Sequence, residues 1–314
     1  MNGVPLRLGT RRSPMAMAQS AHVARLLTAR TGNQVELVGL RTFGDTSQAD
    51  LAQIGGTGVF VSELRKRLLD GAIDFAVHSL KDLPTWQDGA LILAAVPPRD
   101  DPRDVLAARN GAKLADLRAA ARIGTGAPRR AAQLLMIRPD LRPVPIRGNA
   151  DTRLGKVDSG EVDAVVLAYA GLARIGRLDA VTQVFEPDEM MPAPGQGALA
   201  VECLASRPDL ARLLSQVDDR PSRAAAEAER SVLAALQAGC SAPIGAYAAG
   251  VNELRLDAIV AAADGGGALR ASAAGPADQA AAIGRQVAAE LLSRGAARYS
   301  DVSAGHLQIG EDAK

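Results

Sequence analysis

Residues 7–19 read RLGTRRSPMAMAQ, and residues 122–133 follow the same plan as RIGTGAPRRAAQ. Each stretch has an apolar strand end, a Gly-Thr pair, a short loop, a proline near a helix start and a glutamine in that helix. A second pair, at 70–83 and 159–172, places a helix-ending glycine and an aspartate before an apolar strand. Patterns this short also arise by chance. Two of them in the same order predict two similar α/β lobes whose matching loops face each other across a cleft.

Apolar and helical runs alternate along most of the chain. Runs typical of buried strands lie at 6–9, 35–40, 74–78, 91–96, 163–168 and 197–203. Helical patterns lie between them at 14–30, 59–69 and 128–138, and each is stopped by a nearby glycine or proline. This alternation favours an α/β fold with largely parallel sheets.

Two proline-rich segments are expected to connect the lobes. VPPRDDPRD at 96–104 would carry the chain into the second lobe, and MMPAPGQGA at 190–198 would bring it back. A small α+β domain is predicted after this return, with a helix at 221–237 that starts at a proline and is stopped by Gly239. Its other elements are expected near 244–250, 254–263 and 277–294, with a hairpin connection at 262–270. We therefore expect domain 1 at residues 1–97 and 198–218, domain 2 at 98–197, and domain 3 at 219–314.

The charge balance excludes some classes of partner. Lys and Arg number 36 and Asp and Glu number 35, so no overall field attracts nucleic acid or an anionic membrane. No stretch approaches the roughly 18 consecutive apolar residues of a membrane span, and the first residues lack the apolar run of a signal peptide. Two cysteines cannot build a disulfide framework, and the histidines and cysteines lack metal-ligand spacing. We expect a cytoplasmic protein without a metal.

Arginines gather at the loops of the repeat, namely Arg11, Arg12, Arg129, Arg130, Arg147, Arg153 and Arg174. We expect each to sit at a strand-to-helix turn, where backbone N–H groups and the helix dipole also favour anions. Several planar guanidiniums in one cleft indicate a ligand with several carboxylates or phosphates. The alternative is that individual arginines cap helices or pair with neighbouring acids.

The sequence AVHSLKDLP is the main candidate for catalysis. A strand there runs into Ser79, Lys81 and Asp82, which places an ammonium and a carboxylate at the strand end. Asp82 can stabilise a cation that develops during a reaction or move a proton, and Lys81 can form a Schiff base. His78 precedes the turn and is expected in the core or behind the site residues, and not in catalysis. The glycine-rich stretch 48–64 lacks the Gly-Lys-Ser/Thr end of a nucleotide P-loop and is interpreted as a lid.

Cys240 follows the predicted helix stop directly, in AGCSAPIG. Most free cysteines are small buried hydrophobic residues. A loop position between Gly239 and Ser241 leaves room for something bulky, so covalent attachment of a group through this thiol is the second interpretation. The residues by themselves leave both interpretations open.

Nine stretches occur in an order that is specific, although each of them alone is a weak signal. They are RLGTRRSP, IGGTGVF, FAVHSLKDLPT, PPRDDPRD, GTGAPRR, IRGNADTR, DAVVLAYAGLARIG, PAPGQGALAVE and AGCSAPIGAYA. Over essentially its whole length the chain resembles the porphobilinogen deaminase (hydroxymethylbilane synthase) family. The resemblance implies two lobes like those of periplasmic binding proteins, a small C-terminal domain, and a monomeric transferase of heme biosynthesis in the cytoplasm.

The resemblance also implies the chemistry. Four porphobilinogens are condensed head to tail, each losing ammonia to leave an electrophilic azafulvene, and hydrolysis releases the linear tetrapyrrole hydroxymethylbilane. Chain growth begins on a dipyrromethane cofactor that a thioether joins to Cys240. Asp82 is implied as the catalytic group that holds pyrrole N–H groups and stabilises positive charge. Each pyrrole ring bears an acetate and a propionate, which matches the guanidiniums.

The remaining site residues follow from the same resemblance. The cofactor is expected to contact Ser79, Lys81, Asp82, Thr125, Arg129, Arg130 and Arg153, and the substrate acids to contact Arg11, Ser13, Gln19, Arg147 and Arg174. Gly56, Thr57 and Phe60 are expected in the lid, with Asn149 and Gln196 near the site. The family pattern has lysine where this chain has Thr57 and serines where it has Gly126 and Ala127, so carboxylate contacts there are expected to differ.

Two other functions compete with this interpretation. A non-catalytic two-lobed anion-binding protein of the solute-receptor type shares the fold, but it needs no cysteine at position 240 and usually has an export signal. A lysine-dependent lyase would use Lys81 and would need a carbonyl substrate. The cysteine is present and an export signal is not evident, which favours the deaminase.

Overall fold

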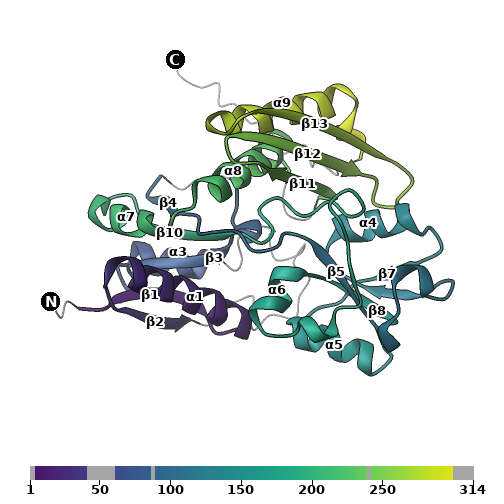
Figure 1. The fold of residues 1–314 in the computed structure, drawn as a ribbon, viewed down its shortest axis with the longest axis horizontal. Coiled ribbons are helices and arrows are strands. Elements are labelled where there is room, and N and C mark those ends of the chain that lie inside the picture. Colours follow the sequence, from purple (N-terminus) through teal and green to yellow (C-terminus); the bar gives the residue numbers. More distant parts are fainter. Residues whose placement is uncertain (1–3, 41–60, 86–88, 239–241, 300–314) are drawn as a thin grey trace, which may run out of the picture.

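The computed structural model describes residues 4–40, 61–85, 89–238 and 242–299, which form three sheets with helices packed on them (Figure 1). The first sheet has the strand order β2-β1-β3-β10-β4, the second β7-β6-β8-β5-β9, and the third β11-β12-β13. Figure 1 shows the third sheet and its helices above the other two. Within these ranges, none of the helices combines the length and the apolarity that a bilayer crossing requires.

The first lobe combines the N-terminal part of the chain with a later return. Its strands and helices are β1 (Leu6–Arg11), β2 (Val35–Leu40), β3 (Phe75–Ser79), β4 (Leu91–Ala95), β10 (Leu199–Leu204), α1 (Pro14–Thr31), α3 (Ser62–Leu69) and α7 (Pro208–Leu214). Helix α1 begins where Ser13 Oγ accepts a hydrogen bond from the N–H of Ala16, next to a proline at the first helical position. Leu8, Leu27 and Phe75 are fully buried in one cluster, so the strand ends of this sheet are rigidly placed.

The second lobe is built from the middle of the chain. Its strands and helices are β5 (Asp104–Ala108), β6 (Arg122–Gly124), β7 (Arg142–Val144), β8 (Ala164–Ala168), β9 (Gln183–Val184), α4 (Pro128–Ile137), α5 (Ala150–Asp158) and α6 (Tyr169–Arg174). Val105, Val165 and Leu172 are fully buried in one of its core clusters. The predicted helix at 128–138 is confirmed, and the proline after it limits its length.

The two lobes have the same topology, which confirms the internal repeat. The strand orders match position by position, with β1 equivalent to β6, β3 to β8 and β10 to β5. In each sheet four strands run the same way and one, β10 or β5, runs against its neighbours. The expectation of largely parallel sheets is therefore confirmed for four strands of each sheet, and the fifth, antiparallel strand was not anticipated. This strand runs against its neighbours because the chain enters it from the other lobe. The crossover segment 96–103 leads into β5, and the return segment 190–198 leads into β10.

The C-terminal part of the chain forms the predicted small α+β unit. Its elements are α8 (Arg220–Ala235), β11 (Ile244–Ala249), β12 (Glu253–Ala261), β13 (Ala268–Pro276) and α9 (Ala280–Ser293). The hairpin connection expected at 262–270 is confirmed, because it joins β12 to β13, which pairs with β12 along its whole length; the bounds of β13 were not predicted. The domain boundaries given above stay a prediction.

The predicted stop of helix α8 at Gly239 is wrong. The helix ends at Ala235, and Gln237 takes the left-handed conformation with φ 51°. The N–H groups of Gln237 and Ala238 donate to the carbonyls of Ala234 and Leu233 at 3.1 and 3.0 Å, which satisfies the end of the helix before the glycine is reached.

Candidate active site

The carboxyl end of β3 carries the residues predicted for catalysis. Ser79 is the last residue of the strand, and one 3₁₀ turn, η1 (Leu80–Asp82), follows with Lys81 half-buried and Asp82 exposed. Ser79 Oγ accepts a 2.9 Å hydrogen bond from Nε2 of Gln19 on α1. Gln19 and Ser79, which lie 60 positions apart in the sequence, thus meet beside this turn.

Arg230 of α8 fixes the turn that presents Asp82, although the sequence did not single it out. Its Nη1 donates to the carbonyl oxygens of Leu80 and Leu83 at 3.2 and 2.7 Å, and its Nη2 donates to that of Pro84 at 2.7 Å. The C-terminal unit therefore holds the backbone around the candidate catalytic carboxylate. No sequence signal pointed to this role, because all three acceptors are backbone groups.

In the second lobe, Arg129 and Arg130 converge on the carboxylate of Asp104. Nη2 of each arginine lies 2.7 Å from an oxygen of Asp104, and all three residues are buried. Burial by itself raises the pKa of Asp104, but the two guanidiniums outweigh it and hold that pKa well below its usual range. The Asp104 carboxylate is therefore ionised at neutral pH. Asp104 lies at the end of the expected crossover segment, and no motif in the sequence indicates a role for it.

Lys81 lies near the same group of charges. Its Nζ donates to Oε1 of Gln196 at 3.3 Å. Burial and, after it, the positive charge of Arg130 lower the pKa of Lys81 to about 8, although the carboxylates of Asp82 and Asp104 act in the opposite direction. Lys81 is therefore mostly charged at neutral pH but titrates close to it.

Two of the predicted arginines do not lie at strand-to-helix turns. Arg153 lies within α5, where its Nε donates to the carbonyl of Gly148 at 2.9 Å. Arg174 lies on the last turn of α6, because that helix begins at Tyr169, directly after β8. A cation is favourable at this carboxyl end of a helix, and Arg174 also pairs with Asp100 at 2.7 Å. Burial lowers the pKa of both guanidiniums.

Three of the smaller predicted side chains support local backbone structure. Oγ of Ser13 and Oδ1 of Asn149 accept N–H groups in the first turns of α1 and α5 at 3.3 and 2.8 Å, and Oγ1 of Thr125 accepts the N–H two residues later at 3.2 Å. Arg11 is the half-buried last residue of β1, and Arg147 is exposed in the connection before α5. These residues lie at the carboxyl ends of β1 and β6 or in the connection between β7 and α5.

Several predicted residues lie outside the described residues. They are Cys240 and the lid residues Gly56, Thr57 and Phe60. Their roles stay predictions. Across the described ranges, no group of three or more His, Cys, Asp and Glu side chains is placed to hold a metal ion.

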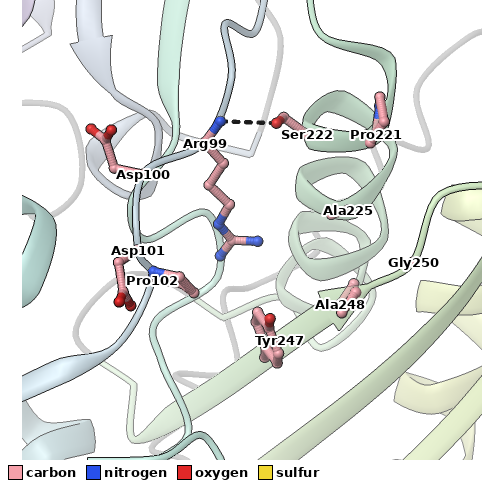
Figure 2. A pocket seen from close by; sticks show the side chains of 11 residues that line it. Arg99, Asp100, Asp101, Pro102, Pro221, Ser222, Ala225, Tyr247, Ala248 and Gly250 are labelled. Carbon is pink, nitrogen blue, oxygen red and sulfur yellow. Dashed lines mark hydrogen bonds between the residues drawn. The ribbon is translucent and has the colours of Figure 1, made fainter. Parts of the chain in front are cut away.

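A buried ion pair anchors the crossover segment to the C-terminal unit. Nη1 and Nη2 of Arg99 donate to the carboxylate of Glu229 at 2.6 and 3.1 Å. Figure 2 shows a further bond, in which the N–H of Arg99 donates to Ser222 Oγ at 2.9 Å. The guanidinium also lies 5.6 Å from the ring centre of Tyr247. Arg99, Ser222 and Tyr247 border a pocket of about 260 Å³. Among the described residues that line it, none was predicted to bind cofactor or substrate.

A second buried ionic group lies behind β3. His78 Nε2 is 3.4 Å and Arg65 Nη2 is 2.8 Å from the carboxylate of Glu202, and all three residues are buried. His78 therefore lies in the core, as expected. This group joins α3, β3 and β10 without contributing a side chain to the predicted site.

Two sequence models of one family match the chain. The model described as porphobilinogen deaminase, dipyromethane cofactor binding domain, matches residues 6–212, and the model described as porphobilinogen deaminase, C-terminal domain, matches residues 224–293. A porphobilinogen deaminase of Thermobifida fusca is 58% identical over 97% of this chain and 99% of its own length. Porphobilinogen deaminase 1 of Streptomyces coelicolor is 56% identical over 93% of this chain and 96% of its own length.

Solved structures with a similar arrangement are more distant. The methionine binding protein MetQ has a TM-score of 0.44 at 11% identity, over 68% of this chain and 89% of that chain. A periplasmic substrate-binding protein of an ABC transporter from Coxiella burnetii has a TM-score of 0.43 at 15% identity, over 72% of this chain and 96% of that chain. Similarity at this distance does not identify a function.

Proposed function

The chain belongs to the porphobilinogen deaminase family, and on this premise we propose which of its residues perform the family's reaction. The protein is an enzyme of tetrapyrrole synthesis that has a dipyrromethane cofactor and uses porphobilinogen as its substrate. It joins four porphobilinogens head to tail with loss of ammonia and releases hydroxymethylbilane by hydrolysis. Our proposal adds that it is a transferase and acts as a monomer in the cytoplasm. No observation favours the solute-receptor alternative.

The charged groups near the turn fit the cofactor. A dipyrromethane bears two acetates and two propionates, so it needs several donors of positive charge. Lys81 from the first lobe and Arg129, Arg130 and Arg153 from the second supply four cations, and the charges of Arg130 and Arg129 lower the pKa of Lys81. Hydroxyls of Ser79 and Thr125 lie at the carboxyl ends of β3 and β6. We assign these residues to binding the cofactor's carboxylates.

Asp82 is assigned as the catalytic carboxylate. When bound, the cofactor supplies the pyrrole carbon to which the first substrate unit is joined. Asp82 lies exposed on η1, next to Lys81, and Arg230 holds the backbone that presents it. A carboxylate fixed in this way can accept pyrrole N–H groups and stabilise positive charge on the substrate without reorganising during the reaction.

The incoming substrate is assigned to the remaining polar residues. Its acetate and propionate would be bound by Arg11, Ser13, Gln19, Arg147 and Arg174, with Asn149 and Gln196 close by. Gly56, Thr57 and Phe60 are proposed to cover the site as a lid. Cys240 is proposed to hold the cofactor through a thioether.

The observation that carries these assignments is the exposed Asp82 on a turn whose neighbouring charges come from both lobes. The first test is the intact mass of the purified protein. We expect the mass of one dipyrromethane above that of the chain, its loss in Cys240→Ser, and its retention in Cys203→Ala, which changes the buried second cysteine. Retention of the added mass in Cys240→Ser would refute the attachment.

The second test separates catalysis from cofactor binding. Asp82→Ala should keep the cofactor mass and lose turnover by about 10²-fold or more, because its carboxylate acts mainly as charge develops. Asp278→Ala removes an exposed carboxylate of the C-terminal unit and serves as the control, with turnover unchanged. Turnover of Asp82→Ala at the level of this control would remove Asp82 from its assigned role.

A further inference from the structure

The strongest feature without an assigned function is the carboxylate of Asp104. It is the first residue of β5, is fully buried, and contacts both arginines of helix α4. Nε and Nη2 of Arg130 donate to its Oδ1 at 3.1 and 2.7 Å, and Nη2 of Arg129 lies 2.7 Å from its Oδ2. One carboxylate thus holds two guanidiniums that are each about 5% exposed.

The remaining contacts fix the orientation of both arginines. Nη1 of Arg130 donates to the carbonyl of Val166 at 3.1 Å, and Nη1 of Arg129 donates to that of Met191 at 2.5 Å. A guanidinium has five N–H groups, so the bonds between described residues leave N–H groups on both arginines for a ligand. Two cations on one carboxylate also leave this buried group with a net positive charge, which favours an anion.

Gln196 connects this group to the first lobe. Its Nε2 donates to Asp104 Oδ1 at 2.8 Å and to the carbonyl of Pro102 at 2.6 Å, while its Oε1 accepts from Lys81 Nζ at 3.3 Å. The amide therefore has a carboxylate on one side and an ammonium on the other. The charges that face Lys81 come from its own turn, from β5 and from α4, namely those of Asp82, Asp104, Arg129 and Arg130.

We propose that Asp104 is a positioning residue for the cofactor. It orients Arg129 and Arg130 toward the cofactor's carboxylates and, through Gln196, holds the Lys81 ammonium of the other lobe beside them. This inference rests on the proposed function, because it takes the dipyrromethane as the ligand. It differs from a purely structural role in one respect: the negative charge of Asp104 helps to keep Lys81 protonated.

The first measurement is the protonation of Lys81 without any cofactor. Full-length protein in a Cys240→Ser background is labelled with an amine-reactive reagent across a pH series, and the Lys81 peptide is quantified by mass spectrometry. We expect a labelling midpoint of about 8 in this background. Asp104→Asn should lower the midpoint by about one pH unit or more, since loss of a nearby opposite charge disfavours the ammonium.

Glu202→Gln is the matched control for this measurement. Glu202 is likewise a buried carboxylate with an arginine partner, Arg65, but it has no contact with Gln196 or the arginines of α4. Its substitution should leave the Lys81 midpoint unchanged. Gln196→Leu is the second variant, because it keeps the contacts of Asp104 with both arginines. It should lower the midpoint less than Asp104→Asn does, through loss of one acceptor from Lys81.

The second measurement is the fraction of protein that carries the dipyrromethane, read by intact mass with Cys240 present. Asp104→Asn should reduce this fraction several-fold, and Glu202→Gln should not. An Asp104→Asn protein with unchanged loading and an unchanged Lys81 midpoint overturns the inference. If Asp104→Asn shows no cooperative unfolding, the Gln196→Leu variant decides the question. An unchanged Lys81 labelling midpoint in Gln196→Leu then overturns the inference as well. Absence of the added mass from the wild-type chain would instead refute the proposed function, while the labelling midpoint would still decide this inference.

Discussion

Replacing Glu229 by glutamine tests whether one buried carboxylate holds the crossover segment, the return segment and the C-terminal unit together. Four donors surround it: two N–H groups of Arg99 at 2.6 and 3.1 Å, the N–H of Gly195 at 2.7 Å and the N–H of Ala248 at 2.8 Å. Each of the two carboxylate oxygens accepts two of these four bonds. A glutamine amide has only one acceptor oxygen, so its NH₂ group would take the place of the second carboxylate oxygen and would face two N–H donors that it cannot accept.

The expected loss follows from this geometry. Glu229 is fully buried, and breaking a buried ion pair while leaving the partner charge in place costs about 3–5 kcal/mol. Unfolding entropy of about 2.1 cal/mol/K per residue converts 1 kcal/mol into about 1.5 °C for 314 residues. Glu229→Gln should therefore lower the melting temperature by about 5–8 °C.

Circular dichroism during heating measures this shift. Glu290→Gln is the control, because its pair with Arg294 lies on the same C-terminal unit, 3.3 Å apart and half exposed on both sides. An exposed pair of this kind contributes about 0.5 kcal/mol, so its loss should move the melting temperature by about 1 °C or less. A Glu229→Gln protein that melts within about 1 °C of this control would show that the carboxylate does not hold the junction.

Three further outcomes are expected. Gly197→Ala should destabilise the protein more than Gly176→Ala in urea unfolding. Both glycines have positive φ, but only the Cβ added at Gly197 meets the carbonyl oxygen of Asp100, at 2.4 Å. Equal losses of stability would contradict this reasoning. Cys203, whose pKa burial raises to about 11, should resist alkylation at pH 8 until the protein unfolds, as peptide mapping would show. Burial raises the pKa of Glu202, but its histidine and arginine partners lower that pKa below 4.5 overall. The stability that the Glu202 carboxylate contributes should therefore be present above pH 4.5 and disappear on acidification. Glu202→Gln should flatten the acid dependence of urea unfolding.

The arrangement of secondary structure was largely predictable because its causes are local. Apolar runs, prolines at helix starts and glycines after helices act over a few residues, and they placed β1, α1 and α4 within one or two positions. The tandem pattern also predicted the equivalence of the lobes. The reversed direction of β5 and β10 was missed, because a strand's direction depends on which lobe the chain enters, and no run within the strand records this.

The candidate site was predicted in part for the same reason. Asp82 and the arginines stand in short motifs, so the sequence by itself determined which chemical groups the site can use. Asp104, Arg230 and Glu229 were given no role, since each is defined by partners elsewhere in the chain; Asp104 and Gln196 are 92 positions apart. Which charges are buried, paired or left exposed is decided only when the lobes and the C-terminal unit pack, because burial and proximity set the energy of a charge and both arise from tertiary contacts.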